Sequence, residues 1–285
     1  MTSQTIAVLL TCHNRKQNTL DCLERLYHQA IPSPFTVKVY LVDDGSTDGT
    51  GEAVAQQYPQ VTVLQGDGNL FWNGGMRVAF AEAMQHHHDF YLWLNDDTML
   101  YPGAIAKSLK AYQDLVTAQT HGKVIITGAT KDANGELSYG GIKRHSWWYP
   151  LKVTMVPPAQ DHCELCDSMN GNFVLIPQEV VAMVGNLEEQ FVHNFGDYDY
   201  GYRASKQGFS IWLLPGYIGE CDFHLPKWRE ESLSLQERLK AVKNPKGMTL
   251  NEWKVYSQRH GGPLWPIYWL LPYVKLVVTS AFQGK

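Results

Sequence analysis

The stretch that decides the fold is Phe90-Tyr91-Leu92-Trp93-Leu94-Asn95-Asp96-Asp97-Thr98, in which a five-residue apolar run leads into two adjacent carboxylates. A short apolar run of this length is typical of a strand buried on both faces of a parallel sheet. Ligands of an open α/β sheet bind outside the carboxyl ends of its strands, and paired carboxylates there suit a divalent cation that carries phosphate. A solvated acidic turn is the more common reading of an isolated Asp-Asp pair, so the rest of the chain must decide.

The N-terminal half repeats one pattern of apolar strand, polar loop and helix. Strands are predicted at residues 5–10, 37–42, 61–64 and 90–94, and helices at 18–27, 50–58, 76–86 and 103–115. This alternation is the signature of right-handed βαβ units. We therefore expect an α/β fold with a Rossmann-like, mostly parallel sheet flanked by helices.

The pattern changes near residue 125. A strand at 124–127 is followed by the hairpin signal Asn134-Gly135, a strand at 172–176, a helix at 197–207 and a strand at 211–214. We expect a division of labour near residue 125, though not a separable domain.

The C-terminal part is helical, with helices expected at 233–242 and 250–259 before a nearly uncharged stretch at 264–282. Nineteen residues border on the length that crosses a bilayer, but Pro266, Pro272 and clustered aromatic residues weaken that interpretation. Three alternatives stay open: contact with a membrane surface through residues 262–285, packing on the protein itself, and spanning.

Composition sets broad limits. The chain has 285 residues, of which 44% are hydrophobic, so it can bury a full core. A formal net charge of -4 gives no reason to expect nucleic acid as a partner. Five cysteines without regular spacing, and no N-terminal apolar signal segment, predict a cytoplasmic setting, peripheral at the inner face of the cell membrane if the C-terminal stretch contacts it.

Polar clusters follow the first two predicted strands. The first strand ends in a segment containing Thr11, His13 and Arg15, and the second in Asp43-Asp44. A carboxylate at such an edge can accept from a base N–H or from ribose hydroxyls, and it can also cap a helix. No GxGxxG motif follows the first strand, which argues against a dinucleotide site.

Residues 66–77 form a glycine- and asparagine-rich segment. Glycines allow close approach of the backbone to a ligand, and an arginine at the start of the following helix can meet a diphosphate. Since a flexible surface loop would not usually hold Phe and Trp side chains, we expect this loop to face a ligand. The residues expected to contact it are Asn69, Trp72, Asn73, Gly74 and Arg77.

Two later features could carry chemistry. Asp199 and Arg203 stand four apart on a predicted helix and should form an ion pair, which leaves Asp197 as the freer acid or as a capping residue. A lone histidine is more often structural than ligating, but His224 becomes a plausible metal ligand beside a candidate such as Asp97.

Taken in order, five segments resemble the family 2 glycosyltransferases, especially the rhamnosyltransferase-like branch. The resemblance spans residues 5–225 and implies a GT-A fold, a nucleotide-diphosphate sugar donor such as a dTDP- or UDP-sugar, a divalent metal (Mn²⁺ or Mg²⁺) and inversion at the anomeric carbon. The segments that carry it are 8–15, 42–50, 69–77, 94–97 and 196–199.

The resemblance also implies residue roles. Thr11, His13 and Asp44 would hold the nucleoside, with Arg15 as a further nucleotide-sugar contact. Asp96 would support the nucleotide or the metal.

The metal and the base are assigned by the same resemblance. Asp97 would bind the metal directly, and His224 matches a metal-binding His of some members. Asp197 falls where the family places its general base. Two departures are Gly196, where many relatives have Glu, and Arg77, where an Asn is common, so the donor sugar stays open.

On this basis residues 1–225 are the catalytic domain, with 1–125 as its nucleotide-sugar-binding part and 126–225 as its acceptor and catalytic part, and 226–285 are a helical extension. The expected acceptor is a hydroxyl of a glycan or a lipid-linked glycan. One alternative is a sugar-phosphate nucleotidyltransferase, but the glycine-rich phosphate loop it would need after the first strand is absent. Another is a non-catalytic sugar-nucleotide-binding subunit, against which the retention of every candidate acid counts.

Overall fold

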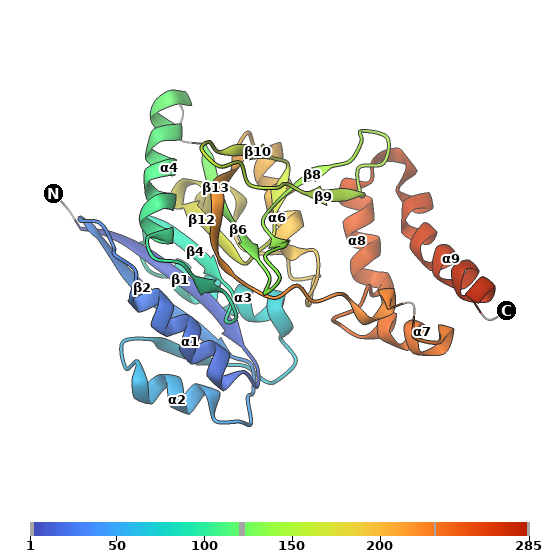
Figure 1. Ribbon diagram of the computed structural model, residues 1–285, viewed down its shortest axis with the longest axis horizontal. Helices are drawn as coiled ribbons and strands as arrows, with labels where there is room; N and C mark the ends of the chain where they lie inside the picture. The colour runs from blue at the N-terminus through green and yellow to red at the C-terminus, as the bar shows by residue number, and fades with distance from the viewer. Residues whose placement is uncertain (1–2, 120–122, 231, 284–285) are drawn as a thin grey trace.

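A ten-stranded central sheet organises the protein in the computed structural model, which describes residues 3–119, 123–230 and 232–283 (Figure 1). Along its main path the order is β10-β13-β6-β12-β4-β1-β2-β3, while β5 pairs with β13 and β7 with β6. The strands are β1 (Gln4–Cys12), β2 (Phe35–Asp43), β3 (Thr62–Gln65), β4 (Phe90–Leu94), β5 (Met99–Leu100), β6 (Val124–Lys131), β7 (Leu137–Tyr139), β10 (Glu164–Cys166), β12 (Phe173–Pro177) and β13 (Ser210–Glu220).

The N-terminal half of the sheet is parallel, as predicted. Strand β1 pairs in parallel with β2 and with β4, and β2 pairs in parallel with β3. Because Cys12 lies opposite Asp43 at the ends of β1 and β2, the polar segments after these strands emerge at one edge. Strand β4 ends at that edge too, which brings Asp96 and Asp97 to it.

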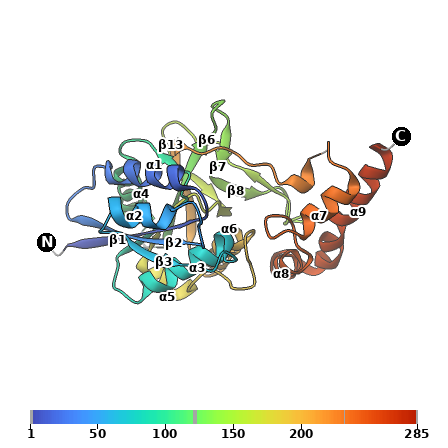
Figure 2. The same cartoon turned by 90° about the horizontal axis from the view of Figure 1, so that it is seen from below.

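Helices cover both faces of this sheet (Figures 1 and 2). Successive side chains of a strand point to opposite faces. Accordingly, Leu9 packs in the core layer that contains Phe80, and Leu10 in the layer that contains Leu23. The helices are α1 (Lys16–Tyr27), α2 (Thr50–Gln57), α3 (Phe71–Met84), α4 (Ala104–Gln119), α5 (Gln178–Val184) and α6 (Gly196–Lys206).

The second half continues the same sheet with mixed strand directions. Strand β12 is antiparallel to both β4 and β6, whereas β13 is parallel to β6. A separate three-stranded sheet is formed by β8 (Gly141–Arg144), β9 (Val153–Met155) and β11 (Ser168–Met169). The predicted boundary at residue 125 therefore lies within a continuous sheet, and the division of labour across it stays a prediction.

Three local predictions differ from the structure. Helix α3 begins at Phe71, not Met76. The Phe71 N–H at its start donates to the side chain of Asp44, which directly follows β2. Strand β13 runs on past residue 214, with an irregular register between Leu213 and Tyr217. The hairpin at Gly135 is present, but Lys131 pairs with Leu137, so its loop comprises residues 132–136 rather than two residues.

The C-terminal extension contains α7 (Leu235–Lys243), α8 (Leu250–His260) and α9 (Trp265–Gln283), after the 3₁₀ turn at Lys227–Arg229. These helices lie at the end of the molecule away from the N-terminus (Figure 2). An aromatic cluster joins them to the rest of the protein. Within the described residues, we find no helix with both the length and the apolar character needed to cross a membrane.

Candidate functional site

Arg15 meets both carboxylates at the end of β4. Its Nη1 lies 2.5 Å from Asp97 Oδ2 and 3.3 Å from Asp96 Oδ1. Burial, and then the neighbouring charge of Asp97, raise the pKa of Asp96 to about 7. Burial and the Asp97 charge thus outweigh the Arg15 guanidinium, which lowers this pKa, and a further cation at this edge would favour the ionised form of Asp96.

The expected metal ligands lie on neighbouring segments. The Cys221 thiol donates to Asp97 Oδ1 at 3.4 Å, and His224 follows three residues later with an exposed side chain. The backbone N–H of His224 donates to the Tyr139 hydroxyl at 3.4 Å. The described part of the chain contains no group of three or more His, Cys, Asp and Glu side chains arranged around one metal position. A carboxylate and an imidazole nevertheless fit an ion whose shell is completed by substrate phosphates and water.

Asp44 organises the loop before α3. Its side chain is buried, with Oδ1 accepting from Gly68 N–H at 2.8 Å and Oδ2 from Phe71 N–H at 2.9 Å. The backbone carbonyl of Asp44 lies 2.5 Å from His13 Nδ1. Asp44 therefore binds the start of α3 and not the helix that follows its own strand, and a nucleoside contact by Asp44 stays a prediction. His13 and Asn69 both have exposed side chains at this edge.

Thr11 packs against helix α3. It is buried, and a Cβ built on Gly75 would lie 2.0 Å from Thr11 Oγ1. Only a glycine lets the helix approach β1 this closely. Gly74 is less constrained, since its Cβ would lie 3.3 Å from Leu70 Cβ.

Two residues expected in the donor site point elsewhere. Asn73 is fully buried, and its Nδ2 donates to the carbonyls of Glu188 and Phe191 at 2.9 and 2.6 Å. Arg77 lies in the second turn of α3, where its Nε donates to Leu187 O at 3.0 Å. The prediction that Arg77 stands at the helix start is therefore wrong, and both side chains fasten the segment before α6 to α3.

Trp72 connects the acidic strand end with the first turn of α6. Its Nε1 donates to Asn95 Oδ1 at 2.7 Å. Its ring lies so close to Gly171 that a Cβ there would be 2.2 Å from Trp72 Cζ2. The Gly171 N–H in turn donates to Asp197 Oδ2 at 3.0 Å. Asn95 and Gly171 did not emerge from the sequence, although Asn95 immediately precedes the two acids.

Asp197 stands in the first turn of α6 and is partly exposed. Its Oδ1 accepts from Tyr198 N–H at 2.8 Å, which leaves each carboxylate oxygen with a further acceptor position. Burial raises the pKa of Asp197 to about 6, against the hydrogen bonds from Tyr198 and Gly171 that lower it. A carboxyl with this pKa is ionised near pH 7 and still basic enough to take a proton.

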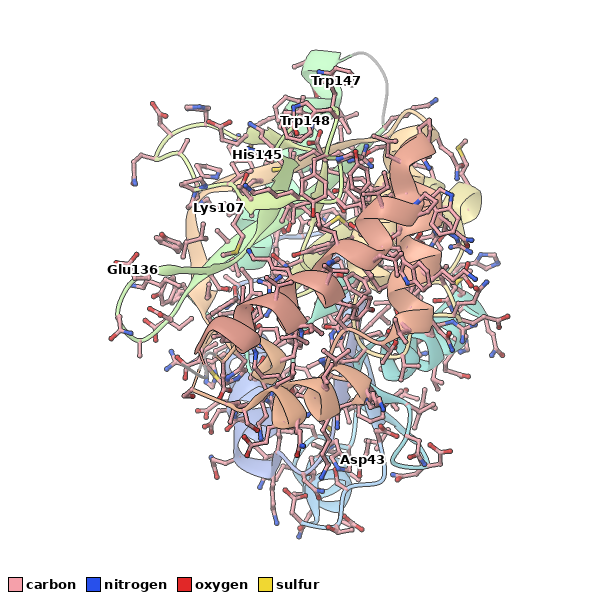
Figure 3. All side chains as sticks on the ribbon, turned by 90° about the vertical axis from the view of Figure 1, so that its right-hand side faces the viewer. Asp43, Lys107, Glu136, His145, Trp147 and Trp148 are labelled. Atoms are coloured by element: carbon pink, nitrogen blue, oxygen red, sulfur yellow. The ribbon has the colours of Figure 1, made fainter. Side chains whose placement is uncertain are left out.

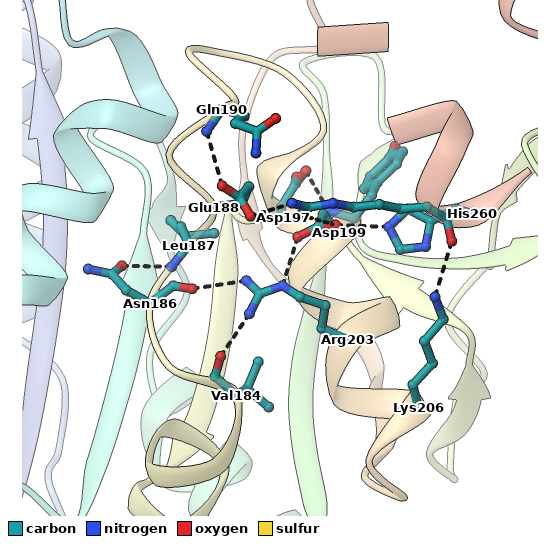
Figure 4. Close-up of polar contacts among 12 residues, drawn as sticks. Val184, Asn186, Leu187, Glu188, Gln190, Asp197, Asp199, Arg203, Lys206 and His260 are labelled. Carbon is teal, nitrogen blue, oxygen red and sulfur yellow. Dashed lines mark hydrogen bonds and ion pairs between the residues drawn. The ribbon is translucent and has the colours of Figure 1, made fainter. Parts of the chain in front are cut away.

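Asp199, two residues after Asp197, is fully buried (Figure 4). The predicted ion pair with Arg203 is confirmed, at 2.8 Å. Arg259 and His260 of the extension also approach Asp199, at 3.4 and 2.9 Å. No sequence signal marks these two, because they lie about sixty residues from Asp199 in the chain.

The sequence of the chain is similar to a known family and to characterised proteins. Residues 7–156 match the family described as "Glycosyl transferase family 2". An N-acetylglucosaminyl-diphospho-decaprenol L-rhamnosyltransferase of Mycobacterium tuberculosis is 25% identical over 205 residues, which cover 63% of this chain and 64% of the relative. The succinoglycan biosynthesis protein ExoA of Rhizobium meliloti is 27% identical over 224 residues, 75% of this chain and 62% of that protein. The chain thus matches less than two thirds of either relative's length.

Solved structures share the fold. S. aureus TarS in complex with UDP-GlcNAc superposes with a TM-score of 0.55 at 15% identity, over 84% of this chain and 65% of that one. The mannosyltransferase of Pyrobaculum calidifontis, in complex with GDP-Man and Mn²⁺, gives a TM-score of 0.52 at 16% identity over 100% of this chain and 77% of that one. These neighbours are GT-A proteins, and the mostly parallel sheet with flanking helices is that fold. The residues that match the family, 7–156, make up more than half of this chain. The chain therefore belongs to glycosyl transferase family 2.

Proposed function

We propose that this chain is an inverting, metal-dependent glycosyltransferase, which moves a sugar from a nucleotide-diphosphate sugar to a hydroxyl of a glycan or lipid-linked glycan. The observation that carries the proposal is the placement of Asp197. It is connected through Gly171, Trp72 and Asn95 to the residues Asp96 and Asp97, with hydrogen bonds at both ends of the connection.

Asp197 acts as the general base. An acceptor hydroxyl oxygen attacks the anomeric carbon on the face opposite the diphosphate, and Asp197 takes the hydroxyl proton as the new bond forms. Two backbone N–H groups, from Gly171 and Tyr198, hold the carboxylate in place, so little reorientation is needed at the moment of transfer.

The donor diphosphate lies at the carboxyl edge of β1, β2 and β4. There Arg15 supplies positive charge in place of Arg77, whose guanidinium is engaged by the Leu187 carbonyl and Glu189. Asp97 and His224 would hold Mn²⁺ or Mg²⁺, which when bound offsets the charge on the leaving diphosphate. Thr11, His13 and Asp44 remain the proposed nucleoside contacts.

The names of the similar proteins and of their ligands support one class of donor and one class of acceptor. The names of the structural neighbours' ligands, UDP-GlcNAc and GDP-Man, support a nucleotide sugar as donor class, for which we keep dTDP- or UDP-sugars as the first candidates. The name of the M. tuberculosis relative describes a diphospho-decaprenol acceptor, which supports a lipid-linked glycan here.

The base is tested by Asp197→Asn. Sugar transfer from the donor that binds is expected to fall by at least about a thousandfold, while the donor still raises the melting temperature of the variant, because the base contributes to chemistry and not to donor binding. Asp161→Asn, in an exposed loop, is the matched control and should keep full activity. Normal turnover by Asp197→Asn would overturn the assignment.

The metal role needs a separate measurement. Removal of divalent ions with a chelator should abolish transfer, and added Mn²⁺ or Mg²⁺ should restore it. Undiminished activity after exhaustive chelation would reject the roles of Asp97 and His224. Donor hydrolysis without acceptor distinguishes an enzyme from a non-catalytic binding subunit.

A further inference from the structure

Helix α9 presents a continuous apolar face to solvent. The side chains on this face are between 42% and 58% exposed, although all of them are large and aliphatic; they are Ile267, Leu270, Leu271, Val274, Val277 and Val278. Their spacing of three and four residues places them on one side of a helix. On the other side Tyr268 and Leu276 are buried, and the Tyr273 hydroxyl donates to Met248 O at 2.9 Å.

Two exposed tryptophans belong to a loop that contacts α9 through Tyr268. Trp147 and Trp148, in the loop between β8 and β9, are 90% and 59% exposed and lie at the top of Figure 3. The loop is fixed to α9, because the Tyr268 hydroxyl donates to the Trp148 carbonyl and the Tyr149 and Tyr268 rings stand 4.8 Å apart. We call the exposed aliphatic residues of α9 together with Trp147 and Trp148 the apolar surface.

The C-terminal extension that contains α9 is basic, whereas the rest of the chain is acidic. Residues 226–285 carry ten Lys and Arg against four Asp and Glu, a net charge of +6. The preceding 225 residues carry fourteen against twenty-four, a net charge of -10. Lys275 is exposed on α9, and Lys254 Nζ lies 5.9 Å from the centre of the Trp269 ring. The extension that contains α9 is therefore basic, and Lys275 is next to Val274 of the apolar surface.

We propose that the apolar surface docks on the interfacial region of an anionic membrane, with α9 lying in the plane of the lipid headgroups. An exposed aliphatic helix face with nearby Lys and Arg is the pattern of an interfacial helix, and tryptophan favours the same depth. A second copy of the chain would bring two +6 extensions together, so charge favours an anionic lipid partner over self-association.

In the docked orientation, the candidate site lies toward the membrane end of the molecule. Strand β1 runs from the N-terminal end of the molecule toward the end that holds the extension, so its carboxyl edge faces the same end as α7–α9 (Figures 1 and 2). The acidic N-terminal part would then point away from anionic headgroups. This inference does not depend on the reaction that the site performs.

Flotation with lipid vesicles tests the proposal on the full chain. Vesicles of phosphatidylcholine with 30% phosphatidylglycerol, a composition of our choosing, should recruit the protein at least about tenfold better than phosphatidylcholine alone, and salt should weaken the binding. Val274→Glu, and separately Trp147→Ser with Trp148→Ser, should each reduce recruitment at least about fivefold. Met183→Glu, at an apolar position 53% exposed on α5, should leave it unchanged.

Each other outcome decides against the proposal. Equal recruitment of wild type and Val274→Glu, or no recruitment to either vesicle, would overturn it. A dimer in solution that Val274→Glu dissociates would show instead that a second copy covers the apolar surface. Circular dichroism and the melting temperature verify that the variants are folded, and since Val274 is exposed, a folding failure is not expected; Trp147→Ser with Trp148→Ser provides an independent second result.

Discussion

Nε2 of His260, the last residue of α8, lies 2.9 Å from Oδ1 of Asp199 in α6. Asp199 is two residues from Asp197, the proposed base, and its other oxygen accepts from Arg203. Burial alone would raise the pKa of Asp199, but the hydrogen bond from His260 and the charge of Arg203 hold it below its ordinary value. The C-terminal extension therefore helps to fix the helix that carries the base.

We predict that Asp199→Ala destabilises the protein by about 3 kcal/mol, because removing one partner of a buried ion pair leaves the others uncompensated. Arg203 and Arg259 lose that partner, although Arg203 keeps the carbonyls of Val184 and Asn186 and Arg259 keeps its ion pair with Glu188. Urea unfolding measures the change. Asp161→Ala, at an exposed position, should stay within about 0.5 kcal/mol of wild type; equal effects of the two substitutions would contradict the proposed role of the network.

The pH dependence of kcat/KM should report Asp197. With its pKa raised to about 6, the carboxyl is protonated and inactive at pH 5 and ionised at pH 7. Activity should therefore rise with pH through about 6, a limb that belongs to the free enzyme. Initial rates from about pH 3.5 to pH 8 reveal it, and Asp161→Asn should retain it. A limb near pH 4 would show that burial does not shift the group in the working enzyme.

Two adjacent glycines of α3 should differ in their tolerance of alanine. Gly75→Ala would place its Cβ 2.0 Å from Thr11 Oγ1 and force α3 from β1, at a cost of about 1–3 kcal/mol. Gly74→Ala would meet Leu70 at 3.3 Å and gain helix propensity, so it should be within about 1 kcal/mol of wild type. Thermal unfolding of the pair compares them. Equal stability of the two variants would refute the close approach of α3 to β1.

Stability should decrease in mild acid through His193. Burial, followed by the charges of Lys246 and Arg15, lowers the pKa of His193 to about 4. Below pH 6.5 the unfolded chain binds a proton that the folded chain does not, so this contribution is present above pH 6.5 and lost as the pH falls toward 4.

The corresponding experiment is urea unfolding of His193→Gln at pH 7, 6 and 5. The variant should lose less stability than wild type over this range, by on the order of 1–2 kcal/mol, given the partial exposure of the side chain. His87→Gln, at an exposed position, should follow wild type. Identical slopes for all three proteins would exclude His193 as the acid-sensitive group.

Trp72→Phe tests the connection between the acids and the base. Phenylalanine keeps a ring beside Gly171 but cannot donate to Asn95, so one hydrogen bond is lost. We expect kcat to fall about fivefold, the equivalent of about 1 kcal/mol, with donor affinity little changed. Steady-state kinetics with isothermal titration of the donor separates the two quantities. A loss confined to donor affinity would place Trp72 in donor binding only.

Local pattern determined much of this protein. The apolar runs at 5–10, 37–42 and 90–94 predicted parallel strands, because a strand buried on both faces must be continuously hydrophobic. The ends of those strands predicted the sheet edge at which Asp44 and the Asp96–Asp97 pair lie. Helical spacing predicted the ion pair of Asp199 with Arg203. The ordered motifs of the chain also pointed to its family.

Only the tertiary structure decided which side chains are free to act at that edge. Asn73 and Arg77 looked available in the sequence, yet carbonyls near residue 190 hold both, because the segment before α6 packs on α3. His260 reaches Asp199 from sixty-one residues away, a contact that no local pattern encodes. The sequence by itself therefore determined the strands and the family, whereas long-range packing decided the surroundings of each candidate group, and through burial it raised the pKa of Asp96 and of Asp197.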